Sequence, residues 1–434
     1  MARVRTGLIL LFLALMVLFY FSGNYMLAPI LDTLHKEGII PGTEKTWRLY
    51  AGFLKTVPGF IGLALTFLWG VLGDKLGRRR LLLVLGLAMG VSLILVSTVT
   101  SYIEIMAYLI IFGVALLGIS PVIYAFIADV VPSEKRGKGY ATYYASSVFG
   151  MVLGLLMAGI LLNWRTAYLI AGVFVLVFVV GLYWSSKGVT IGYSDTSATM
   201  EKKYSLREAV RGALTRSVLI VMIQIIAWTI PWGMLAYFSV DYIMTRWGIP
   251  RTYASLILIV ATISIAFGHI IGGTLSDRLA KRKGPIGRVQ VSIAGIIIGY
   301  IAMVAMLSYP YPYGEVSFAA LLPPALLAVA GMMFTTFAYP NISTVISDCV
   351  KPEYRGTIFS IYNILNSAGW AIGPTIYGAL VYFFLSSGLT RSTALLYAAV
   401  GLVSLWLLCI IAWILLARYY PRDYNRIRGP TAQQ

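Results

Sequence analysis

The sequence predicts an all-α membrane protein in which twelve transmembrane helices form two six-helix bundles. The 434 residues are 59% hydrophobic and only 12% charged, whereas soluble domains are about 25% charged. Twelve apolar segments are each long enough to cross a hydrocarbon layer of about 30 Å as a helix. A long polar segment divides them six and six, and the same basic loop motif occurs in each half.

The apolar segments follow one another through short polar connections, which is the pattern of a multi-pass membrane protein. The first segment follows Arg3 and Arg5 and has no small-residue cleavage pattern at its end, so we interpret it as a transmembrane helix and not as a cleaved signal. The predicted spans are residues 7–31, 49–73, 81–99, 103–128, 139–162, 165–186, 217–240, 252–275, 289–309, 318–347, 357–385 and 392–417.

The connection after the sixth segment is the longest polar stretch of the chain. It contains Gly188, Gly192 and Ser194, followed by a charged piece that is compatible with a helix. A polar stretch of this kind is typical of a domain boundary. We therefore predict an N-terminal bundle at 1–186, a cytoplasmic linker at 187–216, a C-terminal bundle at 217–417 and a cytoplasmic tail at 418–434.

The basic residues predict the orientation of the chain. With a cytoplasmic N-terminus, 26 of the 34 Lys and Arg residues fall in cytoplasmic segments. The positive-inside rule therefore predicts that both termini lie in the cytoplasm. We expect an integral, multi-pass protein of the plasma membrane. The net charge of +18 then follows from topology, and we expect no nucleic-acid partner.

Two pairs of loops repeat between the halves. Residues 70–80 (GVLGDKLGRRR) and 273–283 (GTLSDRLAKRK) share the spacing from Gly to Asp and the basic tail, although Ala280 replaces Gly77. The first copy is predicted to be a tight turn between helices, which glycine tolerates. Residues 129–137 (DVVPSEKRG) and 348–356 (DCVKPEYRG) repeat at an offset of 219, against 203 for the first pair. Two registered copies indicate a tandem duplication.

The 70–80 motif resembles the signature loop between helices 2 and 3 of the major facilitator superfamily. The resemblance covers the whole chain and implies two six-helix bundles around a central cavity, with alternating access of a midplane substrate site. It also implies a cytoplasmic gate, in which Asp74 meets the helix that starts near Arg355 and Asp277 does the equivalent near Arg136. The alternative is that these charges only set topology. The gating candidates are Asp74, Arg78, Arg136, Asp277, Arg278 and Arg355.

Ionisable side chains within spans are costly and are functional by default. Asp32 and Lys55 lie in the facing outer halves of the first two helices, so we predict that they pair for coupling or as an outer gate. The alternative is a snorkelling lysine and an interfacial aspartate. His269 is a candidate for a proton-linked role or for a hydrogen bond within its bundle. Protons are thus the candidate coupling ion.

Neutral polar and aromatic residues are the candidates for substrate contact. Buried amides are costly unless they are paired, so amides are stronger candidates than aromatic rings. Such an interior favours a neutral, zwitterionic or amphipathic compound, whereas Lys55 in a cavity would favour an anion. The candidates are Asn24, Tyr25, Tyr124, Tyr144, Gln224, Trp228, Trp232, Tyr339, Asn341, Tyr362, Asn363, Asn366 and Trp370.

The sequence predicts a transporter and not an enzyme. It shows no phosphate-binding loop, no nucleophile with a base in reach and no metal-ligand cluster, so we expect no cofactor and no metal. We predict secondary active or facilitative transport of a small organic solute by a monomer in contact with membrane lipid. The alternatives are a lipid or lysolipid transporter, a multidrug-type exporter and a receptor without transport. Residues 24–32 and 164–168 faintly resemble spinster-type lipid transporters.

Overall fold

The computed structural model describes residues 6–131, 136–189, 214–351 and 354–428. Within these ranges the chain is helical and contains no strand. It divides into two compact units, Met1–Glu201 and Lys202–Gln434. Most of the predicted linker and the last six residues of the predicted tail lie outside the described residues.

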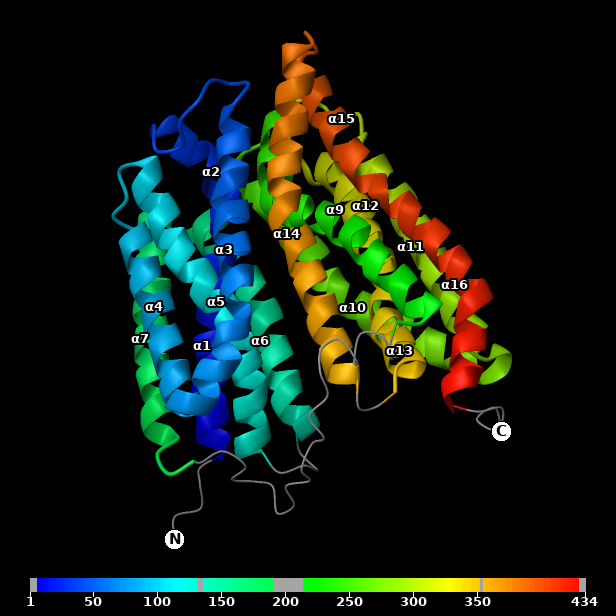
Figure 1. The fold of residues 1–434 in the computed structure, drawn as a ribbon. Helices are drawn as coiled ribbons and strands as arrows, with labels where there is room; N and C mark the ends of the chain where they lie inside the picture. Colours follow the sequence, from blue (N-terminus) through cyan, green and yellow to red (C-terminus); the bar gives the residue numbers. More distant parts are fainter. Residues whose placement is uncertain (1–5, 132–135, 190–213, 352–353, 429–434) are drawn as a thin grey trace. The chain divides into compact units, whose positions relative to one another are not determined.

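The first unit is built from helices that run alongside one another (Figure 1). A short π-helical turn, Met157–Leu161, extends its sixth helix. The helices are α1 (Thr6–Tyr25), α2 (Leu27–Lys36), α3 (Trp47–Leu76), α4 (Arg78–Val96), α5 (Tyr102–Val130), α6 (Arg136–Leu156) and α7 (Trp164–Ser185).

The second unit has the same kind of architecture. A 3₁₀ turn, Thr336–Ala338, lies within its fourth span. The helices are α9 (Arg216–Trp247), α10 (Arg251–Lys283), α11 (Ile286–Leu307), α12 (Phe318–Thr335), α13 (Tyr339–Cys349), α14 (Arg355–Ser386), α15 (Arg391–Val403) and α16 (Leu405–Arg428).

The described residues contain twelve helical segments that are long and apolar enough to cross a membrane, which confirms the twelve predicted spans. Three of these segments are divided into two helices, α1 with α2, α12 with α13, and α15 with α16. In the second case Pro340 stands in the first turn of α13, where its missing N–H ends the hydrogen-bond ladder of the preceding helix. Helix α16 also continues to Arg428, beyond the predicted apolar span.

The helices of the two units pack in the same order. In the first unit α1 contacts α6 and α7, α3 contacts α5, and α4 contacts α5 and α7. In the second unit α9 contacts α14 and α16, α10 contacts α12, and α11 contacts α12 and α16. The helices that contact each other in one half therefore occupy the same positions in the chain order as those that contact each other in the other half. The shared scheme confirms the prediction of two six-helix bundles.

Glycines allow close contacts between helix backbones in both bundles. A Cβ atom on Gly150 would lie 2.6 Å from the carbonyl oxygen of Leu18, and one on Gly154 would overlap the carbonyl oxygen of Ser22. In the second unit, 219 residues later, a Cβ on Gly373 would likewise overlap the carbonyl oxygen of Ile230. Small residues allow helix backbones in membranes to approach closely. The repeat therefore extends from loop motifs to the packing of helix pairs.

The loop motif between α3 and α4 is shorter than the sequence suggests. Helix α3 continues to Leu76 and α4 begins at Arg78, so Gly77 alone makes the turn, at a φ of 83°. The second copy has Ala280 at this position, and a left-handed φ is costly for alanine. Helix α10 accordingly continues to Lys283, and Gly284 makes the turn at a φ of 66°. The predicted spans ended at residue 73 and resumed at residue 81, so the turn of the first copy is shorter than those bounds implied.

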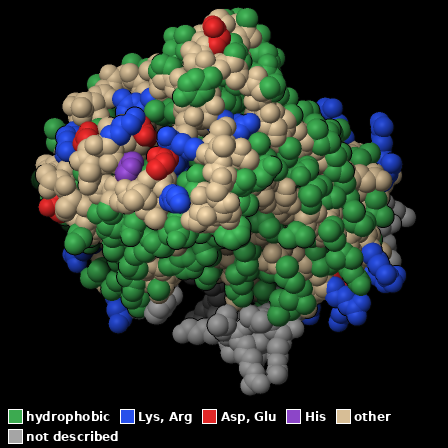
Figure 2. Space-filling view, turned by 90° about the horizontal axis from the view of Figure 1, so that it is seen from above, with side chains coloured by type: hydrophobic (Ala, Val, Ile, Leu, Met, Phe, Trp, Pro, Cys, Tyr) green, Lys and Arg blue, Asp and Glu red, His purple; other side chains and the backbone are tan. Residues whose placement is uncertain are grey.

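The surface and the two cysteines fit a membrane environment. The view in Figure 2 shows mainly hydrophobic side chains around the flanks and charged side chains of both signs on the part of the face that lies over the first unit. Glu37, directly after α2, accepts hydrogen bonds from Trp164 Nε1 at 3.0 Å and from Arg165 at 3.3 Å, and these contacts hold the end of α2 against α7. Cys349 and Cys409 are both free and buried.

Candidate functional site

A partly buried ion pair joins α4 to α5 and includes Arg78 of the first loop motif. Arg78 binds the carboxylate of Asp129 at 2.7 Å and donates to the carbonyl oxygen of Ala125 at 3.2 Å. The Asp129 side chain is only 5% exposed. Arg78 was predicted as a gating residue, but its partner was not. The signal for Asp129 was present, because this residue opens the second repeated motif.

Two predicted gating arginines occupy equivalent positions in the two units. Arg136 donates to the carbonyl oxygens of Ala128 at 3.0 Å and Val131 at 3.3 Å. Arg355 donates to the carbonyl oxygen of Val350 at 3.2 Å. Each arginine thus serves carbonyl groups that the end of the preceding helix leaves without a partner. The contact of Arg136 with Val131 and that of Arg355 with Val350 are thus related by the same offset of 219 residues.

The aspartates of the loop motif differ in what the structure shows. Asp277, predicted to face the Arg136 region of the other half, binds Arg288 of its own unit at 2.7 Å. Its side chain is 62% exposed, and Arg278 beside it is exposed as well. The side chain of Asp74 lies outside the described part of the structure. The gate itself therefore stays a prediction.

The expected pair of Asp32 with Lys55 is not formed within the described residues. Asp32 binds Lys36, one turn along the same helix, at 2.6 Å. Lys55 instead donates from Nζ to the amide oxygen of Asn24 at 2.7 Å. This contact joins α3 to α1 and brings together a predicted coupling residue and a predicted substrate residue.

Tyrosines cluster between α5 and α6 of the first unit. The Tyr124 hydroxyl donates to the Tyr144 hydroxyl at 3.2 Å, and the Tyr124 ring lies 5.1 Å from the ring of Tyr143. The Tyr143 hydroxyl lies 3.0 Å from Ser120 Oγ. Tyr143 is buried and Tyr144 is 57% exposed, so the cluster runs from the interior of the unit to its surface.

Tryptophans form an aromatic cluster in the second unit. The ring of Trp232 stacks on Trp370 at 6.3 Å and lies 5.7 Å from Trp406, which is also 5.9 Å from Trp228. Trp406 Nε1 donates to the carbonyl oxygen of Trp228 at 3.1 Å. Trp228, Trp232 and Trp370 were predicted as candidates for substrate contact. Trp406 was missed because the apolar pattern of its span gives no sign of the direction in which it points.

Gln224 lies one helical turn before Trp228 and is 2% exposed. Neither its amide nitrogen nor its amide oxygen has a hydrogen-bond partner in the part of the chain that the structure describes. Buried amides are almost always paired, and an exception calls for an explanation such as a water molecule or a ligand. Among the predicted substrate residues, Gln224 is therefore the one whose side-chain amide most needs a hydrogen-bond partner.

The contacts of the Asn341 side chain indicate a role in stability. Its amide nitrogen lies 2.8 Å from Ser276 Oγ and 2.9 Å from Ser292 Oγ, and all three side chains are fully buried. We expect Asn341→Ala to cost about 1–3 kcal/mol of stability, because the buried hydroxyl groups of Ser276 and Ser292 lose the amide nitrogen that binds them. The thermal unfolding midpoint in detergent measures this loss. Asn363→Ala, at an exposed position of α14, is the control, and equal midpoints for the two variants would contradict the assignment.

The remaining candidates have varied surroundings. His269 stacks on Tyr339 with ring centroids 5.1 Å apart. Tyr362 is buried, and Tyr25 is half-buried at the end of α1. Asn366 has a buried amide oxygen without a partner among the described residues.

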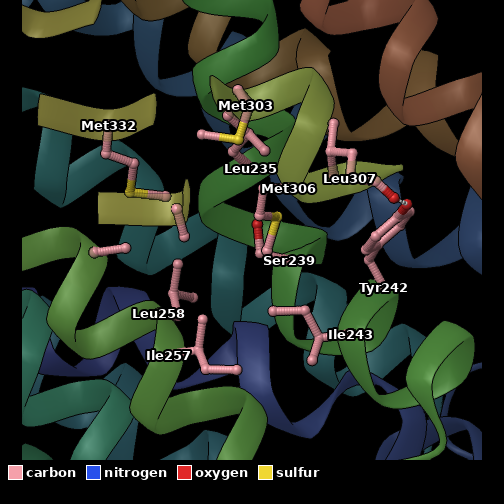
Figure 3. A pocket seen from close by; sticks show the side chains of 12 residues that line it. Leu235, Ser239, Tyr242, Ile243, Ile257, Leu258, Met303, Met306, Leu307 and Met332 are labelled. Atoms are coloured by element: carbon pink, nitrogen blue, oxygen red, sulfur yellow. Dashed lines mark hydrogen bonds between the residues drawn. The ribbon is translucent and has the colours of Figure 1, made fainter. Parts of the chain in front are cut away.

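A small apolar pocket lies inside the second unit between α9, α10, α11 and α12 (Figure 3). At its edge the Tyr242 hydroxyl donates to the carbonyl oxygen of Leu307 at 2.5 Å. None of the predicted substrate residues lines it. The lining residues are Leu235, Ser239, Tyr242, Ile243, Ile257, Leu258, Ala261, Met303, Met306, Leu307, Ala328 and Met332.

The sequence of this chain is similar to those of known membrane transporters. Residues 13–374 match the family described as Major Facilitator Superfamily. The multidrug resistance protein MdtG of Proteus mirabilis is 26% identical over 83% of this chain and 85% of its own. The bacillibactin exporter of Bacillus subtilis is 22% identical over 83% of this chain and 86% of its own.

Solved structures show the same fold. The crystal structure of a bacterial homologue of the human lysosomal transporter Spinster matches with a TM-score of 0.81 at 16% identity, and the match covers 98% of this chain and 99% of the other. A D-xylose-proton symporter gives a TM-score of 0.70 at 17% identity, with the same coverage of both chains.

Proposed function

Because the chain belongs to the major facilitator superfamily, we propose that it exports a small amphipathic organic compound by alternating access. The protein is an integral, multi-pass membrane transporter. The family is not an enzyme class. The proposal concerns the class of substrate and the direction of its transport.

The observation that carries the proposal is the unpaired amide of Gln224 beside a group of tryptophans. Ligand sites are typically lined by apolar and aromatic side chains with a few polar groups that fix orientation. Tryptophan rings contact an apolar body, and an amide both donates and accepts hydrogen bonds. A compound with an apolar body and a hydrogen-bonding group suits this combination. The tyrosine cluster of the first unit offers the same two kinds of contact.

The relatives support the direction of transport. Two proteins that match over most of their length are named as a multidrug resistance protein and as a bacillibactin exporter. We propose that this chain also moves its substrate outward, across the plasma membrane. The excess of basic residues in alternate connections supports cytoplasmic termini. We further propose that protons drive the transport and that the protein works as a monomer.

The proposal is tested with purified protein in liposomes that carry an imposed pH gradient. The probes are ethidium and fluorescein, which are amphipathic and aromatic, and uridine and D-xylose, which are polar and neutral. We expect gradient-driven movement of at least one aromatic probe and none of the polar probes. Transport of uridine or D-xylose alone, or of no probe, would contradict the proposal.

Gln224→Leu makes the test specific to the proposed site. Replacing an unpaired buried amide with an apolar side chain of similar volume is neutral or stabilising. We therefore expect an unchanged or higher thermal midpoint together with a loss of transport rate of about tenfold, since one hydrogen bond to the substrate disappears. Gln290→Leu, at an exposed position of α11, is the matched control. Undiminished transport by Gln224→Leu would remove this residue from the site.

A further inference from the structure

Lys55 lies on a face of α3 that is mostly buried in the first unit. Residues three or four apart share one side of a helix, and the neighbours of Lys55 on that side are Ala51, Gly52, Pro58 and Gly59. The first three are buried and Gly59 is half-buried. A lysine on a lipid-facing side would instead have exposed neighbours. The position therefore directs Lys55 toward protein and away from lipid.

The partner of this ammonium group is neutral. Lys55 Nζ binds the amide oxygen of Asn24 at 2.7 Å, whereas each of the five ion pairs found among the described residues joins a base to a carboxylate. These pairs are Lys36 with Asp32, Arg48 with Glu44, Arg78 with Asp129, Arg165 with Glu37 and Arg288 with Asp277. Lys55 therefore has no carboxylate partner within the described residues.

This arrangement leaves hydrogen-bond donors available inside a membrane span. An ammonium group has three donors and an amide nitrogen has two. The oxygen of Asn24 takes one donor of Lys55, and the amide nitrogen of Asn24 has no hydrogen-bond partner among the described residues. A charged group within a span is costly unless it is paired. Two adjacent donor groups, one of them cationic, suit the two oxygens of a carboxylate.

We propose that Lys55 and Asn24 bind the anionic group of the transported compound, so that the substrate is an amphipathic organic anion such as an aromatic carboxylate. The inference rests on the proposed function and specifies its substrate class. Helix α1, which carries Asn24, packs against α6, and α6 carries Tyr144 of the tyrosine cluster. The contacts of Gly150 with Leu18 and of Gly154 with Ser22 place Asn24 about three helical turns from Tyr144 along α6. The same unit thus carries both the polar anchor and an aromatic cluster.

The test compares 2-naphthoate and 2-naphthamide by calorimetric titration of the purified protein. The two probes share the aromatic ring system and shape, but one carries an anionic carboxylate and the other a neutral carboxamide. We expect the wild-type protein to bind the carboxylate at least about tenfold more tightly than the amide, because a hydrogen bond to a charged group is strong. Lys55→Met should abolish this preference. Lys36→Met, which removes the same charge from a side chain that is 72% exposed, should retain it.

Asn24→Asp provides a second test that does not depend on removing the lysine. It places a carboxylate beside Lys55, so we expect an internal ion pair that competes with 2-naphthoate, together with an unchanged or higher thermal midpoint. Absent or equal binding of the two probes by the wild-type protein would overturn the inference, and so would an unaltered preference in both variants. If ethidium is transported in the liposome assay in that case, the proposed function stands without this substrate class.

Discussion

Arg78→Ala is expected to destabilise the first unit by about 1.5–3 kcal/mol, the usual range for a hydrogen bond to a charged group, because the ion pair that it breaks is partly buried. The carboxylate of Asp129, whose side chain is 5% exposed, loses the guanidinium that binds it at 2.7 Å. The link between α4 and α5 is lost with it. The thermal midpoint of the purified protein in detergent measures the effect, and we expect a lower yield of folded protein as well.

The double variant Arg78→Ala with Asp129→Asn separates this electrostatic effect from lost packing. Neutralising the aspartate should recover part of the stability, because it removes the buried charge that Arg78 compensates. Arg80→Ala is the control, since Arg80 is a neighbouring arginine with an exposed side chain. If the single and double variants unfold at the same midpoint, the ion pair is not the source of the stability.

Gly154→Ala is the second substitution with a large expected effect. Its methyl group would overlap the carbonyl oxygen of Ser22, which belongs to a helix backbone and cannot rotate away. The contact between α1 and α6 must therefore open, and overpacking of this kind costs about 1–3 kcal/mol or more. Gly373→Ala should behave in the same way against Ile230 in the second unit. Thermal midpoints of both variants test this expectation.

Gly401→Ala is the matched control, because it is the same substitution at an exposed helical position where a Cβ atom would meet nothing within 4 Å. Alanine is about 1 kcal/mol more favourable than glycine in a helix, so this variant should be neutral or slightly more stable. A midpoint for Gly154→Ala as high as that of Gly401→Ala would show that the helix contact is not close.

The fold was predictable because its signals are long and local. A span needs about 20 apolar residues, and a pattern of that length survives errors of several residues at its ends. The exact turn was harder to predict. The motif at 70–80 contains three glycines, and only backbone geometry shows that Gly77 alone adopts a left-handed conformation. The Ala280 substitution, noted in the sequence, proved informative, because it moves the turn of the second copy to Gly284.

Side-chain partners were less predictable than helices. Asp32 and Lys55 have opposite charges and fall in neighbouring spans, but partner choice depends on helix rotation, which hydropathy does not encode. Lys36, one turn away, is the nearer base for Asp32. Asn341 illustrates the same limit, because the sequence shows an amide within a span and only the fold shows the two serine hydroxyls around it.

The burial of both cysteines has a practical consequence for measuring conformational change. Cys349 and Cys409 are 0% exposed, so thiol-reactive labels should leave the folded wild-type protein unmodified. A cysteine introduced at an exposed position of each unit would then be the only site that a spin label or fluorophore modifies. Distance distributions between two such labels, recorded with and without transported compound, can be obtained without first replacing the native thiols.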